Sequence, residues 1–242
     1  MLDFHRVHLY PEPSLSSNID LDKVIEDTAQ VLKCDFKVHE PFFEHHSIDV
    51  ERTRISEIKQ PFERQPKEHQ DFDLYGRPTA LYDGFELQRL LAPAFQTDVH
   101  IIFTNLLTCT FSEDDWRYHA RAVVCGTPSI ISTAGIVEAP AKPREFYASQ
   151  LDTYSLKKKL AGRFIDYGDE KMTEVAVGYV LQALFFFVTG GEPFCASDSC
   201  RLYNAHWQED LIRTQVENPA LCARHRSLAN KFNRRLSARK RI

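Results

Sequence analysis

The segment "GYVLQALFFFVTGGEPFCASDSC", residues 178–200, decides how we expect this chain to fold. Its first half ends an apolar, aromatic run that predicts a buried helix from about residue 171 to residue 189. Gly190 and Gly191 predict the helix end, because glycine accepts the left-handed conformation that follows a helix C-terminus. Cys195 and Cys200 follow directly. They are half of a metal site, partners in a disulfide, or two thiols without a specific role.

Upstream of this helix, the sequence alternates between strands and helices. The pattern predicts strands in 4–10, 35–43, 98–107 and 126–137, and helices in 16–33 and 82–95. The polar cap candidates are Ser17, Asn18, Asp20 and Asp83. A strand, a helix and a second strand in this order favour a parallel pair with a right-handed crossover. We therefore expect an α/β fold.

Two further helices are predicted after the cysteine pair, in 207–217 and from residue 222 to about residue 237. We expect an α/β domain over residues 1–189 and a small helical subdomain over residues 190–242, packed on it and held by zinc. Residues 45–77 are polar and weakly periodic, so they form a surface excursion or part of a lid.

Composition excludes several classes of protein. A net charge of -4 argues against a molecule whose whole surface binds nucleic acid. The start of the chain has no apolar signal segment, and the longest apolar run is too short to span a bilayer, so we expect no signal peptide and no membrane partner. We expect a cytoplasmic protein, where the six cysteines are thiols or metal ligands rather than disulfides.

Four potential zinc ligands lie close together near the end of the chain: Cys195, Cys200, Cys222 and His225. Two short-spaced pairs joined by an arm suit a tetrahedral zinc ion, because each pair supplies two ligands from one local turn. The alternatives are four unrelated residues or a disulfide between the first two cysteines. His206 is the alternative fourth ligand. The other cysteines, Cys34, Cys109 and Cys125, are expected to be small core residues.

This part of the chain resembles the archaemetzincins, zinc peptidases of the metzincin group, from about Asp98 to His225. Their signature is His-Glu-x-x-His-x-x-Gly-x-x-His, followed by Cys-x4-Cys-x-Met, an arm and Cys-x-x-Cys. The matching residues are Gly191, Pro193, Cys195, Cys200 and Cys222. Leu202 stands in place of the methionine, and His225 in place of the last cysteine. The resemblance implies a twisted, mostly parallel sheet of about five strands, an active-site-type helix and a helical C-terminal part.

The first half of that signature is missing. The three catalytic zinc ligands would fall at Leu184, Val188 and Phe194, and the general-base glutamate at Phe185, and none of these side chains binds zinc or takes a proton. The only other His-Glu pair begins at His39, where the spacing and the following proline do not put two imidazoles on one helix face. We therefore expect that hydrophobic packing has replaced the catalytic centre. The cleft in which a peptidase of that family would bind its substrate is expected to bind peptides or a protein partner instead.

Two other functions stay open. One is an active zinc-dependent hydrolase with unusual ligands such as Asp115, His119 or His206. The segment 112–125 opens with a Ser-x-x-Asp start signal and is predicted to be a helix or a loop. In a helix, Asp115 and His119 would share one face, or form a surface ion pair at a capped helix start. The other is nucleic-acid binding by the C-terminal tail, because eight Lys or Arg and no acidic residue follow Cys222. Lys142 and Arg144 line a groove for an acidic or extended partner, or belong to a solvated loop.

Overall fold

The computed structural model describes residues 4–13, 15, 19–58, 67–68, 80–95, 98–148 and 153–239. Its centre is a five-stranded sheet of order β2-β1-β6-β10-β9, in which β9 is an antiparallel edge and the other strands run parallel. The strands are β1 (Arg6–Tyr10), β2 (Asp35–Val38), β6 (Val99–Thr104), β9 (Val123–Val124) and β10 (Ser129–Ser132). The predicted α/β fold with a mostly parallel sheet of about five strands is confirmed.

The first crossover is the helix α1 (Leu21–Val31), which joins β1 to β2. Asp20 caps it, because its side chain accepts a hydrogen bond of 3.0 Å from the backbone N–H of Lys23. Ser17 and Asn18, the other cap candidates, lie outside the described residues.

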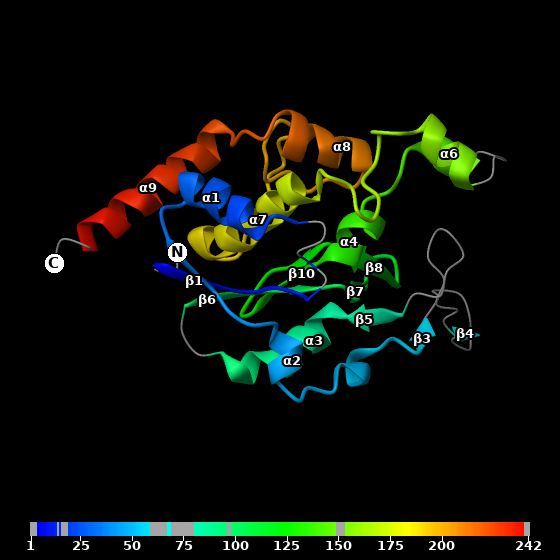
Figure 1. The fold of residues 1–242 in the computed structure, drawn as a ribbon, viewed down its shortest axis with the longest axis horizontal. Coiled ribbons are helices and arrows are strands. Elements are labelled where there is room, and N and C mark those ends of the chain that lie inside the picture. Colours follow the sequence, from blue (N-terminus) through cyan, green and yellow to red (C-terminus); the bar gives the residue numbers. More distant parts are fainter. Residues whose placement is uncertain are drawn as a thin grey trace.

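Helix α7 (Met172–Thr189) lies with α1 over one face of the sheet (Figure 1). It is apolar around its whole circumference, and this is the pattern of a helix surrounded by protein. By length and composition it could cross a membrane, yet 83% of the segment is buried inside the protein. Its end is closed by Gly190, which is left-handed with φ 83°. The sequence therefore placed this helix and its end correctly.

The core around α7 is completed by residues from both ends of the described chain. Phe4, just before β1, packs against Phe232 with ring centroids 4.7 Å apart, and against Phe187. Phe232 belongs to α9 (Ala223–Arg239), the last helix, which lies beside α1 in Figure 1. One hydrophobic cluster thus spans the two predicted domains, and the boundary at residue 189 stays a prediction.

The opposite face of the sheet carries α2 (Phe42–His45) and α3 (Gly84–Leu91) over a second, smaller core. Asp83 caps α3 as predicted, accepting hydrogen bonds of 3.0 Å from the N–H groups of Phe85 and Glu86. Beside it lies a second sheet of order β5-β7-β8, made of β5 (Leu81–Asp83), β7 (Leu107–Ser112) and β8 (Arg117–Arg121).

The prediction of a helix or loop over residues 112–125 is wrong. Ser112 ends strand β7, residues 113–116 turn, and β8 returns antiparallel to β7. A Ser-x-x-Asp sequence resembles a helix start. Here it connects the two strands of a β-hairpin, which are stabilised by pairing with each other. The expected strand over 126–137 is also shorter, because it becomes helix α4 (Thr133–Glu138) after β10.

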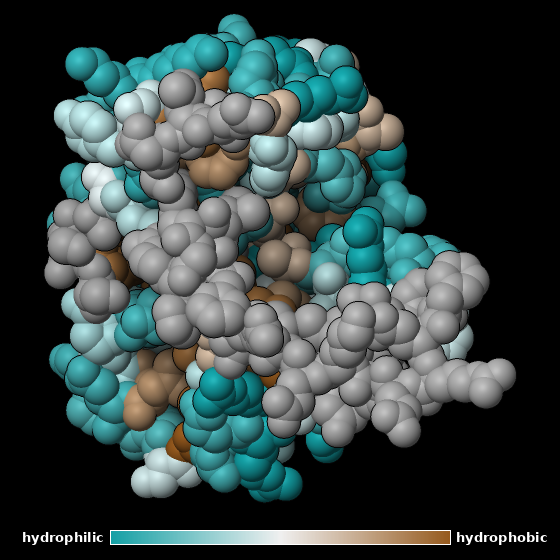
Figure 2. Space-filling model, turned by 90° about the vertical axis from the view of Figure 1, so that its right-hand side faces the viewer, coloured by the Kyte–Doolittle hydropathy of each residue, from teal (hydrophilic) through white to brown (hydrophobic). Residues whose placement is uncertain are grey.

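After α7, the chain forms α8 (Gln208–Ile212), the π-helix η4 (Arg213–Glu217) and α9. The remaining elements are η2 (Val50–Thr53), β3 (Glu57–Ile58), β4 (Lys67–Glu68), η3 (Ala92–Ala94), α5 (Arg144–Ala148) and α6 (Thr153–Lys159). Of the predicted excursion over 45–77, residues 59–66 and 69–77 lie outside the described residues. Figure 2 shows the side of the molecule that carries α6 in Figure 1, where apolar surface in the centre is bordered by hydrophilic residues.

Candidate metal centre

The four predicted ligands come from two segments that the fold brings together. Cys195 and Cys200 lie in the loop that follows α7, and Cys222 and His225 lie at the start of α9. The sulfur atoms of the three cysteines and a ring nitrogen of His225 all lie within 4.8 Å of one another. The structure therefore gathers the predicted set of Cys195, Cys200, Cys222 and His225 into one cluster.

The loop that carries the first two cysteines is held by backbone hydrogen bonds. The N–H of Cys195 donates to the carbonyl of Leu202 at 2.8 Å, and the N–H of Cys200 donates to that of Ser197 at 3.1 Å. Gln182, the polar residue inside the apolar run of α7, donates from its side chain to the carbonyl of Tyr203 at 3.2 Å. Helix α7 therefore fixes the position of the cysteine loop.

The distances within the cluster suit a tetrahedral metal. The Sγ atoms of Cys195 and Cys222 are 3.9 Å apart, and Nδ1 of His225 is 3.1 Å from Sγ of Cys222 and 3.6 Å from Sγ of Cys200. A tetrahedron with zinc–sulfur bonds of about 2.3 Å has sulfur–sulfur edges of roughly 3.8 Å. The donor set and these distances therefore fit a tetrahedral metal ion.

The surroundings of the cluster also suit metal ligands. Two backbone N–H groups, of Ser197 and Cys222, donate to the sulfurs of Cys195 and Cys200, both at 3.4 Å. Burial raises the pKa of the Cys200 thiol to about 12. Burial likewise lowers the pKa of His225, which keeps the imidazole neutral. A bound cation stabilises the thiolate form that burial alone disfavours, and a neutral imidazole is the form that binds metal.

None of the six cysteines, all of which lie in described parts of the chain, forms a disulfide. Cys34 and Cys109 are buried, as expected of small core residues, and Cys125 is half-buried. His206 is exposed and lines a different cavity, whereas the ring of His225 is buried in the cluster. His225, and not His206, is therefore the histidine that lies with the three cysteines in this structure.

Apolar side chains fill the positions at which the resemblance to archaemetzincins would place catalytic ligands. Leu184, Phe185 and Val188 have no exposed surface and belong to the main core. The ring of Phe185 packs edge-on against the ring of His225, with centroids 5.4 Å apart. Phe194, which we also expected to be core, is instead 39% exposed, because it lies beyond the glycine turn on the surface.

A small cavity of about 60 Å³ adjoins this position. Among its lining residues are Arg121 and Val123 from the β8–β9 segment, Tyr179 of α7, Phe194 and His206. Burial raises the pKa of the Tyr179 hydroxyl. The cavity holds a single imidazole and no carboxylate, so its described lining has no set of three metal ligands.

Comparison with known proteins identifies the family of this chain. Residues 3–232 match the model of the "Probable metallopeptidase family (DUF6775)". The chain belongs to this family. The search of the curated proteins gave no match, and neither did the search of the solved structures. For this member of a metallopeptidase family, the described residues that can hold a metal are the Cys3His cluster.

Asp115 and His119 of this metallopeptidase-family chain lie in the β7–β8 hairpin rather than on a helix. Oδ1 of Asp115 is 2.9 Å from Nε2 of His119, and its Oδ2 accepts a hydrogen bond of 2.6 Å from Arg117. The hydrogen bond from His119 lowers the pKa of Asp115 most, and the hydrogen bond from Arg117 lowers it further. Both carboxylate oxygens are engaged at the surface, and this is a surface ion-pair cluster.

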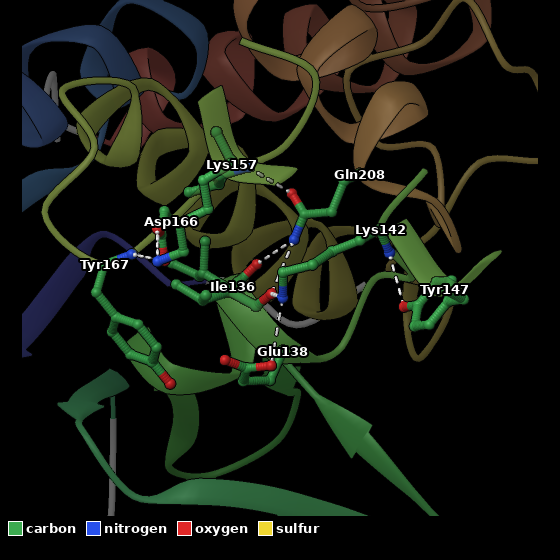
Figure 3. A network of polar contacts seen from close by, with 10 residues as sticks. Ile136, Glu138, Lys142, Tyr147, Lys157, Asp166, Tyr167 and Gln208 are labelled. Carbon is green, nitrogen blue, oxygen red and sulfur yellow. Dashed lines mark hydrogen bonds and ion pairs between the residues drawn. The ribbon is translucent and has the colours of Figure 1, made fainter. Parts of the chain in front are cut away.

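Lys142 neither lines a groove nor belongs to a solvated loop, so both predictions for it are wrong. Its side chain is fully buried, and Nζ donates to the carbonyl of Val137 at 3.2 Å and to the Glu138 carboxylate at 3.3 Å (Figure 3). Burial lowers its pKa, an effect that Glu138 partly offsets. Arg144 packs over the ring of Trp207 at 5.6 Å.

Gln208 ties this buried lysine segment to α8. Its Nε2 donates to the carbonyls of Ile136 and Val137, both at 3.1 Å, and its Oε1 accepts from the N–H of Ile165 at 3.1 Å (Figure 3). Since a buried charge whose partner is removed is costly, we assign this network to fold stability.

Sequence reasoning missed a group of stacked imidazoles on the sheet face opposite α7. Nδ1 of His8 is 2.7 Å from Nε2 of His39, and the ring of His8 also stacks on that of His100 at 4.7 Å. Residues His8 and His100 are direct neighbours in the register of β1 and β6. The signal was the histidine in each of two predicted strands, but only the register places them side by side.

Proposed function

We propose that this chain is a non-catalytic member of its metallopeptidase family, with one structural zinc ion bound by Cys195, Cys200, Cys222 and His225. The observation that carries the proposal is the contrast within a few residues of α7. Four soft and borderline donors gather after the helix, and apolar core fills the helix where catalytic ligands would lie.

Zinc is the metal we propose because thiolate and imidazole ligands in a closed four-coordinate set are typical of structural zinc sites. When bound, the ion would join the cysteine loop after α7 to the start of α9. All four protein ligands are then used, so no open position remains for the water that a catalytic zinc activates.

The resemblance to archaemetzincins supports the same proposal. The mostly parallel sheet, followed by a helix that leads straight into the cysteine loop, is the arrangement that the resemblance implied. In this interpretation the family's catalytic centre has been replaced by packing of Leu184, Phe185 and Val188, while the neighbouring cysteine site is retained.

We further propose that the protein acts in the cytoplasm, where its thiols stay reduced, and that it binds an extended peptide or a protein partner beside the former catalytic position. Phe194 offers an exposed aromatic anchor there, and β9 is a sheet edge. Extended peptides bind such edges through backbone hydrogen bonds.

Metal analysis of the purified protein tests the proposal. We expect one zinc per chain that resists mild chelation, and we expect Cys200→Ser to lose it together with thermal stability. Peptide cleavage should be absent with and without added zinc. A second, exchangeable metal together with chelator-sensitive cleavage would contradict the proposal and favour a hydrolase that uses Asp115, His119 or His206.

A further inference from the structure

Helix α9 presents a cationic outer face. Its buried residues, His225, Ala229, Phe232 and Leu236, follow one another at spacings of three or four, so they form a single inward stripe. The six basic residues of the helix are all exposed: Arg224, Arg226, Lys231, Arg234, Arg235 and Arg239. At about 1.5 Å per residue, they extend over roughly 22 Å of helix.

Acidic residues are absent from this helix, Ala223–Arg239. Arg224 is paired with Glu192 at 3.0 Å. By contrast, the charged groups of Arg226, Lys231 and Arg234 make no ion pair or hydrogen bond with any described residue. The whole chain has a net charge of -4, so the rest of the molecule is acidic and the positive charge is concentrated at this end.

Two cavities follow the two sides of this outer face. One of about 520 Å³ is lined by Lys33, Asn230, Asn233, Arg234, Ser237 and Ala238. The other, of about 620 Å³, shares Asn230 and Arg234 with it and adds Arg226, Lys231 and Arg235. Their linings combine cations with amide and hydroxyl groups, and they contain neither a carboxylate nor a large apolar side chain.

The floor of the first cavity is held in place by Asn233. Its Oδ1 accepts from the N–H of Lys33 at 2.8 Å, and its Nδ2 donates to the carbonyl of Val31 at 3.0 Å. These bonds fix α9 against the end of α1, so the positions of Lys33 and Arg234 are set before any ligand binds.

We propose that the outer face of α9 binds the phosphate backbone of nucleic acids without reading their sequence. Proteins contact phosphates mainly through the charged groups of Lys and Arg, the side-chain amide of Asn and the hydroxyl of Ser. Protein interfaces usually add aromatic or aliphatic anchors, and amphipathic helices that insert into membranes add exposed apolar residues beside the charges. Of the large apolar residues of α9, Phe232 and Leu236 are buried and Leu228 is half-buried against the main core, which leaves an outer surface suited to phosphates.

This binding does not depend on the proposed loss of catalysis. It depends on the charge distribution, because the acidic remainder of the molecule repels a polyanion and orients it toward α9. We expect the binding constant to fall steeply with salt concentration, because each phosphate that a protein cation neutralises releases a counterion.

Fluorescence anisotropy with a labelled 20-base-pair DNA duplex and a labelled 20-nucleotide single-stranded RNA tests the proposal between 50 and 200 mM salt. The double variant Lys231→Ala/Arg234→Ala should bind at least about tenfold more weakly at 100 mM salt. Its plot of log K against log salt should be shallower by about 2, one for each lost phosphate contact.

The control is Lys158→Ala/Lys159→Ala, which removes the same charge from two exposed lysines of α6. It should bind within about twofold of the unchanged protein. Both variants should retain the melting temperature and metal content of the unchanged protein, since all four side chains are exposed. Binding that is independent of salt, equal weakening by both variants, or binding only to an acidic polypeptide or to anionic vesicles would overturn the proposal.

Discussion

Replacing Phe185 by alanine tests our proposal that hydrophobic packing fills the part of α7 where a catalytic centre would lie. The side chain has no exposed surface and packs edge-on against the metal-cluster residue His225. Truncation of a buried phenylalanine removes apolar contacts and leaves a cavity, which costs about 3–5 kcal/mol. For a protein of this size, with a melting temperature that falls by about 2–4 °C per kcal/mol, the expected decrease is roughly 6–20 °C.

The matched control is Phe194→Ala, because Phe194 is 39% exposed and should cost about 1 kcal/mol or less. Urea unfolding followed by circular dichroism gives the free energy of unfolding of both variants, with metal content measured on the same samples. Equal destabilisation by the two changes, or a loss below about 1 kcal/mol for Phe185→Ala, would refute the view that packing fills this position.

Three further predictions follow from other parts of the structure. Removing the metal with a strong chelator, or by Cys200→Ser, should lower the free energy of unfolding by about 4 kcal/mol if the ion is present at a thousand times its Kd, as differential scanning calorimetry would record. A Cβ at Gly178 would lie 1.6 Å from Oε1 of the buried Gln215, so Gly178→Ala should cost about 1–3 kcal/mol in urea unfolding, and an unchanged midpoint would contradict this packing. The pKa of His39 is lowered by burial and by the charges of His8 and Lys37, so the unfolded chain takes up this proton first as the pH falls. Stability should therefore decrease below about pH 6.5, and His39→Gln should flatten that decrease relative to the unchanged protein; parallel pH profiles would show that His39 does not contribute.

Local signals carried much of the fold. The apolar run and glycine stop defined α7, and Asp20 and Asp83 were correct caps because an N-cap acts on the next few residues alone. The spacing of the cysteine pairs was enough to select the four residues that the structure gathers in one cluster. Each of these features depends on residues close in sequence, or on the few residue types that bind a metal such as zinc.

The failures come from tertiary interactions that no sequence pattern shows. Residues 117–121 are a strand because β7 pairs with them, which their own composition does not reveal. Lys142 is buried because Glu138 and the carbonyl of Val137 satisfy its charge, and the rings of Phe146 and Phe164 lie within 6 Å of it. The contact of His8 with His100 arises from strand register alone. In each case the deciding interaction forms only when the chain has folded.

The contact between Phe4 and Phe232 has a consequence for the order in which the protein is made. A ribosome releases β1 and α1 long before it releases α9, and until then Phe4 lacks one of its two aromatic neighbours. The apolar surface around Phe4 is therefore completed only when the last helix has been made. During synthesis a chaperone would have to shield this surface, and a chain interrupted before residue 223 would leave Phe4 without its contact to Phe232.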